Sequence, residues 1–325
     1  MKCRNPITLS KNTNGDHVWD SFPCGQCLNC RITKRQSWTL RILLEMRKHQ
    51  YNYFVTLTYS NDYMPEGGNL EKADLQKFWK RLRKRFGHKI RFFAVGEYGD
   101  KTLRPHYHAI IFSNHEIPVE RRHRPGSSVM YWHSDMVEAS WLSGCRTDCT
   151  PIPGESDGTK IARYVAGYVL KKIKDDRSKK LKPKMVGGYW RVFNLRGWRL
   201  ESLAPQFSTM STKPGIGHDG LMGMAKKADK ANVGPWYLDR ELTKTTDIQM
   251  VRYNGKKWPL DRYMRGKMIV YLGEDTRTDR NKAIGRHTLE LGRTLDAEKA
   301  AKDQIEREEA GYKAEKLFSN TRTTI

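Results

Sequence analysis

The chain has 325 residues, which is long enough for one main domain with a sizeable core and some additions. Lysine and arginine total 60 against 36 acidic residues, and this formal net charge of +24 favours a polyanionic partner, most simply nucleic acid. Because there is no run of 18 apolar residues and no apolar segment typical of a signal peptide after Met1, we expect neither a membrane span nor export from the cell.

The N-terminal segment, residues 1–30, has the composition of a loop and contains Cys24-Gly-Gln-Cys27-Leu-Asn-Cys30, with Cys3 upstream. Two Cys-x-x-Cys steps that share Cys27 can bring three thiolates to one ion, and Cys3 can complete a tetrahedron. This is the ligand set that a structural Zn²⁺ prefers. The alternative is a group of ordinary free thiols, which a reducing cytoplasm also permits.

The remaining pattern predicts alternating helices and strands. Apolar residues at helical spacing predict helices, and β-branched or aromatic runs predict strands. The helices are expected over residues 31–49, 70–86, 133–142 and 160–174, and the strands over residues 53–59, 90–98, 106–112 and 144–150.

The segment Arg104 to Phe112 reads Arg-Pro-His-Tyr-His-Ala-Ile-Ile-Phe, so His106 and His108 share one face of a predicted strand. If the strands over 90–98 and 106–112 form a symmetric hairpin, Glu97 lies opposite His106, about 5 Å away, and can add a carboxylate. The alternative is an exposed glutamate at a strand end. A mixed nitrogen and oxygen ligand set suits Mg²⁺ or Mn²⁺.

The predicted helix over 160–174 carries Tyr164 and Tyr168 one turn apart, with Lys171 on the same face one turn later. Their Cβ atoms are expected about 6 Å apart. Paired tyrosines on a helix are usually packing residues. Beside a strand with two histidines they become candidate nucleophiles, and Lys171 can offset phosphate charge or lower a tyrosine pKa.

Basic side chains suited to following a phosphate backbone lie mainly on the predicted helix over 70–86. The candidates are Lys77, Lys80, Arg81, Lys84, Arg104 and Arg163.

Three segments together resemble the ordered motifs of HUH endonucleases, which start rolling-circle replication of single-stranded DNA. They are Phe54-Val-Thr-Leu-Thr-Tyr59, Arg104 to Phe112, and Tyr164-Val-Ala-Gly-Tyr168-Val-Leu-Lys171. The two-tyrosine helix, the early Cys-x-x-Cys-x-x-Cys-Arg and the later segment 204–217, which ends in Pro-Gly-Ile-Gly, are similar to replication initiators of microviruses, especially the gokushovirus group.

The resemblance implies an α+β fold with a ferredoxin-like (RRM-like) core, in which a central antiparallel sheet is flanked by helices. It implies a site-specific single-strand DNA endonuclease and strand transferase that nicks viral circular DNA at its origin. Metal-assisted attack by a tyrosine would form a 5′-phosphotyrosine, and the strand would later be religated. The implied partners are origin DNA and a host helicase and polymerase, in the cytoplasm of a bacterial host.

We therefore divide the chain into a cysteine-rich segment with a basic helix (1–50), an HUH catalytic core (51–175), a basic and aromatic accessory region (176–273) and a charged helical tail (274–325). Two other functions are open. One is an HUH relaxase or transposase, against which the second tyrosine and the Pro-Gly-Ile-Gly segment argue. The other is a non-catalytic, zinc-dependent nucleic-acid-binding protein, which the cysteines and the charge suggest.

Overall fold

The computed structural model describes residues 3–13, 16–99, 104–124, 126–141, 145–171, 184–186, 189–191, 204–230, 250–271 and 309. The chain divides into two compact units, one of residues 39–220 and one of residues 1–38 with 221–325. These boundaries differ from the four parts predicted from the sequence. The physical reason is that residues 207–210, which we assigned to an accessory region, form a strand of the main sheet.

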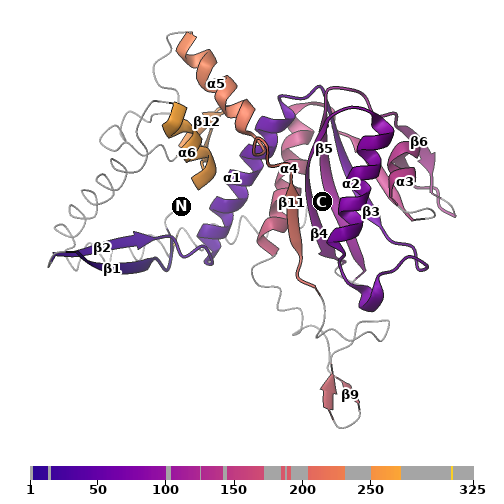
Figure 1. Cartoon of the computed structure of the whole chain (residues 1–325), viewed down its shortest axis with the longest axis horizontal. Helices are drawn as coiled ribbons and strands as arrows, with labels where there is room; N and C mark the ends of the chain where they lie inside the picture. The colour runs from indigo at the N-terminus through magenta and orange to yellow at the C-terminus, as the bar shows by residue number, and fades with distance from the viewer. Residues whose placement is uncertain are drawn as a thin grey trace. The chain divides into compact units, whose positions relative to one another are not determined.

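The unit of residues 39–220 is built on a five-stranded sheet in the order β11-β4-β5-β3-β8, in which every neighbouring pair is antiparallel (Figure 1). The strands are β3 (Tyr51–Thr58), β4 (Ile90–Tyr98), β5 (Pro105–Ser113), β8 (Thr147–Pro151) and β11 (Phe207–Met210). The predicted α+β class with a central antiparallel sheet is confirmed, and the ferredoxin-like arrangement stays a prediction.

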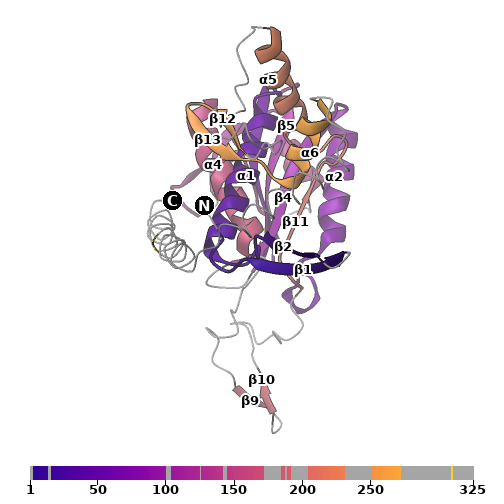
Figure 2. The same cartoon turned by 90° about the vertical axis from the view of Figure 1, so that its left-hand side faces the viewer.

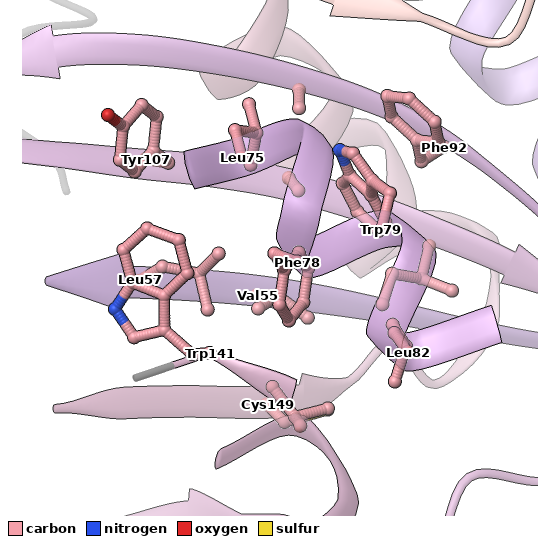
Figure 3. Packing of buried hydrophobic residues seen from close by; sticks show 14 of the residues in the cluster. Val55, Leu57, Leu75, Phe78, Trp79, Leu82, Phe92, Tyr107, Trp141 and Cys149 are labelled. Carbon is pink, nitrogen blue, oxygen red and sulfur yellow. The ribbon is translucent and has the colours of Figure 1, made fainter. Parts of the chain in front are cut away.

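One face of the sheet carries the main hydrophobic core. It is covered by α2 (Lys72–Phe86) and the short α3 (Asp135–Ser140). The apolar stripe of α2 predicted from the sequence lies inward: Leu75, Phe78 and Trp79 are buried against the strands, as Figure 3 shows. The indole of Trp79 stacks on Phe92 of β4 with ring centroids 4.0 Å apart.

The opposite face of the sheet meets the second half of α1 (Leu28–Met46) and α4 (Gly154–Lys171). Glu45 of α1 forms a buried ion pair with Arg91 of β4. Tyr164 of α4 lies against the ring of His108 on β5. Because successive side chains of a strand leave opposite faces, this second face is also the one that carries His106 and Glu97.

Short strands and one turn complete this unit. Two hairpins, β6 (Glu120–His123) with β7 (Met130–His133) and β9 (Lys184–Val186) with β10 (Tyr189–Arg191), were not predicted. A 3₁₀ turn, η1, spans Glu66–Gly68. The helix predicted over 133–142 is shorter than expected, because its first residue ends β7 and only α3 is helical.

In the other unit the expectation of a loop over residues 1–30 is wrong. Two antiparallel strands, β1 (Ile7–Thr13) and β2 (Asp16–Phe22), pair from Ile7–Phe22 to Thr13–Asp16. The sequence carries a hairpin signal here that we did not weigh, since Asn-Gly at positions 14–15 separates two segments with β-branched residues.

The same unit contains most of α5 (His218–Lys230), a hairpin of β12 (Met250–Tyr253) and β13 (Lys256–Pro259), and α6 (Arg262–Tyr271), drawn in orange shades in Figure 2. The predicted charged tail over 274–325 lies outside the described residues, apart from Glu309. Among the helices that the structure describes, none is both long enough and apolar enough to cross a bilayer.

Candidate metal centre and nucleophile

The register of β4 and β5 brings one carboxylate to the two histidines. Glu97 pairs with His106 across the ladder, as the symmetric hairpin predicted, and Val95 pairs with His108. Since residues two apart on a strand share a face, Glu97, His106 and His108 converge on the same side of the sheet. Their ligand atoms all lie within 4.8 Å of one another.

The three side chains meet at a single oxygen. Nε2 of His106 lies 2.8 Å from Oε1 of Glu97, and Nε2 of His108 lies 3.2 Å from the same atom. Glu97 and His108 are buried, while His106 is partly exposed, with 18% of its side-chain surface accessible. The group is therefore set into the sheet face with one histidine open to an incoming molecule.

The far nitrogen of each histidine has a partner that helps to fix its proton. Nδ1 of His106 lies 3.1 Å from the carbonyl oxygen of Arg104, which can only accept, so Nδ1 donates there. Nδ1 of His108 lies 3.1 Å from the hydroxyl of Thr56, the residue directly across from it on β3. Partners of this kind orient histidine ligands in metal sites.

This proton assignment leaves three electron-pair donors facing one another. A neutral imidazole that donates from Nδ1 has its lone pair on Nε2, which here points at a carboxylate oxygen. Such a cluster of acceptors requires a cation, either protons on the imidazoles or a metal ion. Two imidazole nitrogens and one carboxylate oxygen, with further positions left for water or substrate, fit a divalent metal such as Mn²⁺ or Mg²⁺.

The electrostatics of Glu97 agree with this reading. Burial alone would raise the pKa of Glu97, but the hydrogen bonds and charges of His106 and His108 outweigh it and hold that pKa well below its ordinary value. The carboxyl group is therefore ionised and available as a ligand at neutral pH.

Tyr164 is the predicted nucleophile whose side chain the structure describes, and it lies beside this cluster. Its ring is 5.6 Å from the ring of His108 and 5.9 Å from that of Phe54, both edge to face. Phe54 in turn stacks on His108 with centroids 5.4 Å apart. Tyr168 and Lys171 lie on the last turn and a half of α4, and their side chains lie outside the described residues.

The four predicted zinc ligands also come together, in the unit that contains the N-terminus. The sulfur atoms of Cys3, Cys24, Cys27 and Cys30 all lie within 4.8 Å of one another.

A third group, His133 with Asp135 and Glu138, was not predicted. His133 is buried, with Nε2 3.0 Å from Asp135 and 3.3 Å from Glu138. The guanidinium of Arg122 already lies 3.1 Å from the same oxygen of Asp135. A resident cation therefore shares this carboxylate, and the group forms an ion-pair network that joins β7 to α3.

The predicted DNA-binding side chains do not form one surface. Lys77, Lys80 and Lys84 are exposed on α2, which covers the sheet face opposite to His108. Arg163 is exposed on α4, on the histidine side. The remaining two are engaged in hydrogen bonds that hold the fold together.

Arg81 and Arg104 make those structural contacts. Arg81 donates to the carbonyl oxygens of Ser140 and Trp141, each at 2.8 Å, at the end of α3. Arg104 donates to the carbonyl of Tyr59 and ties the start of β5 to the end of β3.

Sequence reasoning missed a second basic surface, on the hairpin of β6 and β7. Arg121 lies over the ring of Trp132 at 5.7 Å, and Arg124 lies over Tyr131 at 5.8 Å. The run Glu-Arg-Arg-His-Arg at 120–124, followed by Tyr-Trp at 131–132, was the available signal. These pairs resemble the mixture of charge and stacking surface that single-stranded nucleic acid prefers.

Comparisons with known proteins agree with this site. Residues 52–173 match the sequence model of a family described as replication-associated proteins of the ORF2 type. The chain is 34% identical over 180 residues to "Replication-associated protein ORF2" of Spiroplasma virus 4, covering 52% of this chain and 54% of that protein.

Two further relatives carry similar names. "Replication-associated protein ORF4" of Chlamydia phage 1 is 39% identical over 162 residues, 47% of this chain and 38% of that protein. "Replication-associated protein VP4" of Bdellovibrio phage phiMH2K is 28% identical over 192 residues, 53% of this chain and 59% of that protein. The chain thus spans about half the length of the curated relatives it matches.

The fold and site define a class, an α+β protein whose antiparallel sheet presents two histidines, a carboxylate and a helix-borne tyrosine on one face. The matched region, residues 52–173, contains all four of these side chains. The predicted resemblance to the replication initiators of microviruses is confirmed by these matches, and a role in phage DNA replication follows from it.

Proposed function

We propose that this protein initiates rolling-circle replication by nicking a circular phage genome at its origin and later rejoining the strand. The observation that carries the proposal is the position of Tyr164, whose ring touches His108 within the cluster of Glu97, His106 and His108. A nucleophile beside a ready-made cation site is the arrangement that phosphoryl transfer requires, because the reaction depends on positioning and charge neutralisation.

A Mn²⁺ or Mg²⁺ ion held by His106, His108 and Glu97 would polarise the scissile phosphate and neutralise its developing charge. The protein's own residues supply the rest. Nδ1 of each histidine is held by Arg104 or Thr56, so the two imidazoles need no reorientation when a cation binds. Phe54 and Tyr164 line the ring of His108 with apolar surface and limit water around the reacting groups.

In the nicking step the tyrosine hydroxyl loses its proton and its oxygen attacks the phosphorus. The bond from phosphorus to the 3′ oxygen breaks, the 3′ oxygen takes up a proton, and the 5′ side stays joined to the protein as a phosphotyrosine. Lys171 is proposed to offset phosphate charge during this step. The released 3′-hydroxyl can prime a host polymerase while a host helicase opens the duplex, which places the reaction in the bacterial cytoplasm.

The second tyrosine gives the proposal a way to finish the cycle. One of Tyr164 and Tyr168 opens the origin, and the other cleaves the regenerated origin after one circuit. The new 3′-hydroxyl then attacks the first phosphotyrosine and closes a circle. Since each covalent link conserves the phosphodiester bond, no ATP is consumed in joining.

The test is covalent capture. The full chain is incubated with circular single-stranded DNA of the phage that encodes it, in Mn²⁺, and adducts that survive denaturation are mapped by peptide mass spectrometry. We expect adducts on Tyr164 or Tyr168, none with the double Tyr→Phe variant, and none with His106→Ala/His108→Ala. Tyr63→Phe is the matched control, because Tyr63 is exposed.

Two outcomes would overturn the proposal. One is the absence of any adduct with the unaltered protein, which would return the chain to a non-catalytic DNA-binding role. The other is an undiminished adduct in the double tyrosine variant. Adducts formed equally well on unrelated single strands would instead favour a relaxase or transposase.

A further inference from the structure

The cysteine cluster in the N-terminal unit is independent of the proposed nickase site. Sγ of Cys3 lies 3.4 Å from Sγ of Cys24 and 3.8 Å from Sγ of Cys27. All four cysteines are free thiols of intermediate exposure. Disulfide-bonded sulfurs would be about 2.05 Å apart, so these contacts are not covalent bonds.

The sulfur separations agree with those of a tetrahedral metal site. With Zn–S bonds of about 2.3 Å, the edge of a tetrahedron of thiolates is about 3.8 Å. Both measured contacts of Cys3 fall close to this value, and the whole set lies within 4.8 Å. Four sulfurs gathered this closely would repel one another as thiolates unless a cation lay between them.

Backbone amides in the cluster point at the sulfurs. The N–H of Cys24 donates to Sγ of Cys3, and the N–H of Cys27 donates to Sγ of Cys24, each at 3.3 Å. Gly25 has a φ of +71°, which allows the chain to turn directly after Cys24. Amide donors favour the ionised form of a thiol, and thiolates are the form that binds metal.

The surrounding elements give the site a mechanical role. Cys3 precedes β1 and Cys24 follows β2, while Ile7 and Phe22 pair at the open end of that hairpin. Cys27 accepts the N–H of Arg31 at its carbonyl, and Cys30 lies in the first turn of α1. The partial positive charge of a helix N-terminus further favours thiolates there.

We propose that Cys3, Cys24, Cys27 and Cys30 bind one structural Zn²⁺ that fastens the base of the β1–β2 hairpin to the start of α1. Four protein ligands complete a tetrahedron and leave no position for substrate, so the site stabilises the fold and takes no part in catalysis.

The full chain, purified without chelator, is analysed for metal by mass spectrometry, and Co²⁺ is substituted to look for the absorption bands of a tetrahedral thiolate site. We expect close to one Zn²⁺ per chain. Cys27→Ser should lose most of it and unfold at lower temperature, while Cys27→His should recover much of it. Cys145→Ser, at a buried cysteine outside the cluster, is the matched control with full zinc.

The His106→Ala/His108→Ala variant separates this site from the proposed catalytic one, because it should keep its Zn²⁺. The proposal is overturned if the unaltered protein carries no zinc and shows no thiolate–Co²⁺ bands. It is also overturned if the zinc is lost from the double histidine variant and kept in Cys27→Ser.

Discussion

Tyr107 lies between the two histidines but points to the opposite face of the sheet. Its hydroxyl donates to the carbonyl of Glu71 at 2.9 Å, accepts the N–H of Glu71 at 2.8 Å, and lies 2.9 Å from the hydroxyl of Tyr59. The side chain is fully buried. The middle residue of the His-x-His segment therefore fixes β5 to the start of α2 while the histidines face the other way.

We expect Tyr107→Phe to destabilise the protein by roughly 1–3 kcal/mol, because it leaves the buried N–H of Glu71 without its acceptor. Urea unfolding followed by circular dichroism would measure this, with Tyr63→Phe as the exposed control. Equal unfolding midpoints for the two variants would contradict the role given to the hydroxyl.

The same hydroxyls predict how stability varies with pH. Burial raises the pKa of both Tyr59 and Tyr107 above the ordinary value of about 10, and their mutual contact raises that of Tyr59 further. A raised pKa means that the folded state holds protons that the unfolded state releases. Stability should therefore be complete below about pH 10 and fall as the pH rises above it. Thermal unfolding between neutral and strongly alkaline pH tests this, and Tyr59→Phe should flatten the curve.

Thr56 positions His108 without reaching the cluster itself, since its hydroxyl lies 3.1 Å from Nδ1. We expect Thr56→Val to weaken Mn²⁺ binding by about 10–100-fold, the usual effect of losing such a partner. Thr56→Ser keeps a hydroxyl and should bind nearly normally. Calorimetric titration with Mn²⁺ measures both, and equal affinities would show that the hydroxyl does not orient the imidazole.

At this scale the sequence predicted much of the site. Glu97 could be placed opposite His106 because the two strands are adjacent in the chain and their hairpin is symmetric. Thr56 could not be found this way. It reaches His108 through a strand pair that is not adjacent in sequence, and nothing in the local pattern specifies that register.

Among the elements, the segment 211–217 has a structural explanation that its sequence alone did not provide. Arg91 at the start of β4 donates to the carbonyl of Pro214 at 2.8 Å and pairs with Glu45. The N–H of Gly217 donates to the other oxygen of Glu45 at 2.7 Å. The segment therefore completes a buried polar network that holds α1 on the sheet.

Arg41 extends this network, because its Nε donates to the carbonyl of Ile216 at 3.0 Å. The two partners approach so closely that only glycine fits beside them. Gly217 has a φ of +79°, and a Cβ atom there would lie 2.6 Å from the carbonyl oxygen of Arg41.

Gly217→Ala should therefore cost more than a left-handed backbone alone. Gly87 is the matched control, because it has a φ of +71° at the end of α2 and open space around its Cα. We expect Gly87→Ala to cost about 1 kcal/mol and Gly217→Ala to cost several times as much, since the backbone of α1 must move. Denaturant unfolding of both variants decides this, and equal losses would exclude the steric contribution.

For the molecule as a whole, the long amphipathic and strongly β-branched segments were predictable, and β4 was predicted with its observed ends, Ile90 and Tyr98. The failures are short strands that depend on distant partners. β11 becomes a strand by pairing with β4, more than a hundred residues earlier in the chain. Four residues have too little periodicity to reveal such a partner.

The excess of positive charge raises the question of which surface holds the DNA strand. The exposed lysines of α2 lie on the face opposite to the histidines. The hairpin of β6 and β7 is joined to the histidine face, because Arg124 lies 3.8 Å from Asp148, the partner of Thr56 across β3 and β8. Burial and the charge of Arg124 lower the pKa of Arg146, so two guanidinium groups lie close together here.

We therefore expect the hairpin, with the adjoining Arg146, to contribute more to strand binding than α2. Replacing Arg121, Arg124 and Arg146 with alanine should weaken binding of a single-stranded oligonucleotide by on the order of tenfold and reduce its salt dependence. Replacing Lys77, Lys80 and Lys84 removes the same charge and serves as the matched variant. Fluorescence anisotropy at several salt concentrations compares them, and a larger loss from the lysine variant would favour α2.

The position of Arg91 and Glu97 on one strand has a genetic consequence. The two residues are six positions apart, so both side chains leave the same face, one toward Glu45 and the other toward the histidines. An in-frame insertion or deletion of one codon between them would turn one of the two onto the wrong face unless a bulge absorbed it. Apolar exchanges at Phe93 or Val95 change only volume. The stretch of genome that encodes residues 91–97 is thus free to vary in spelling but not in length.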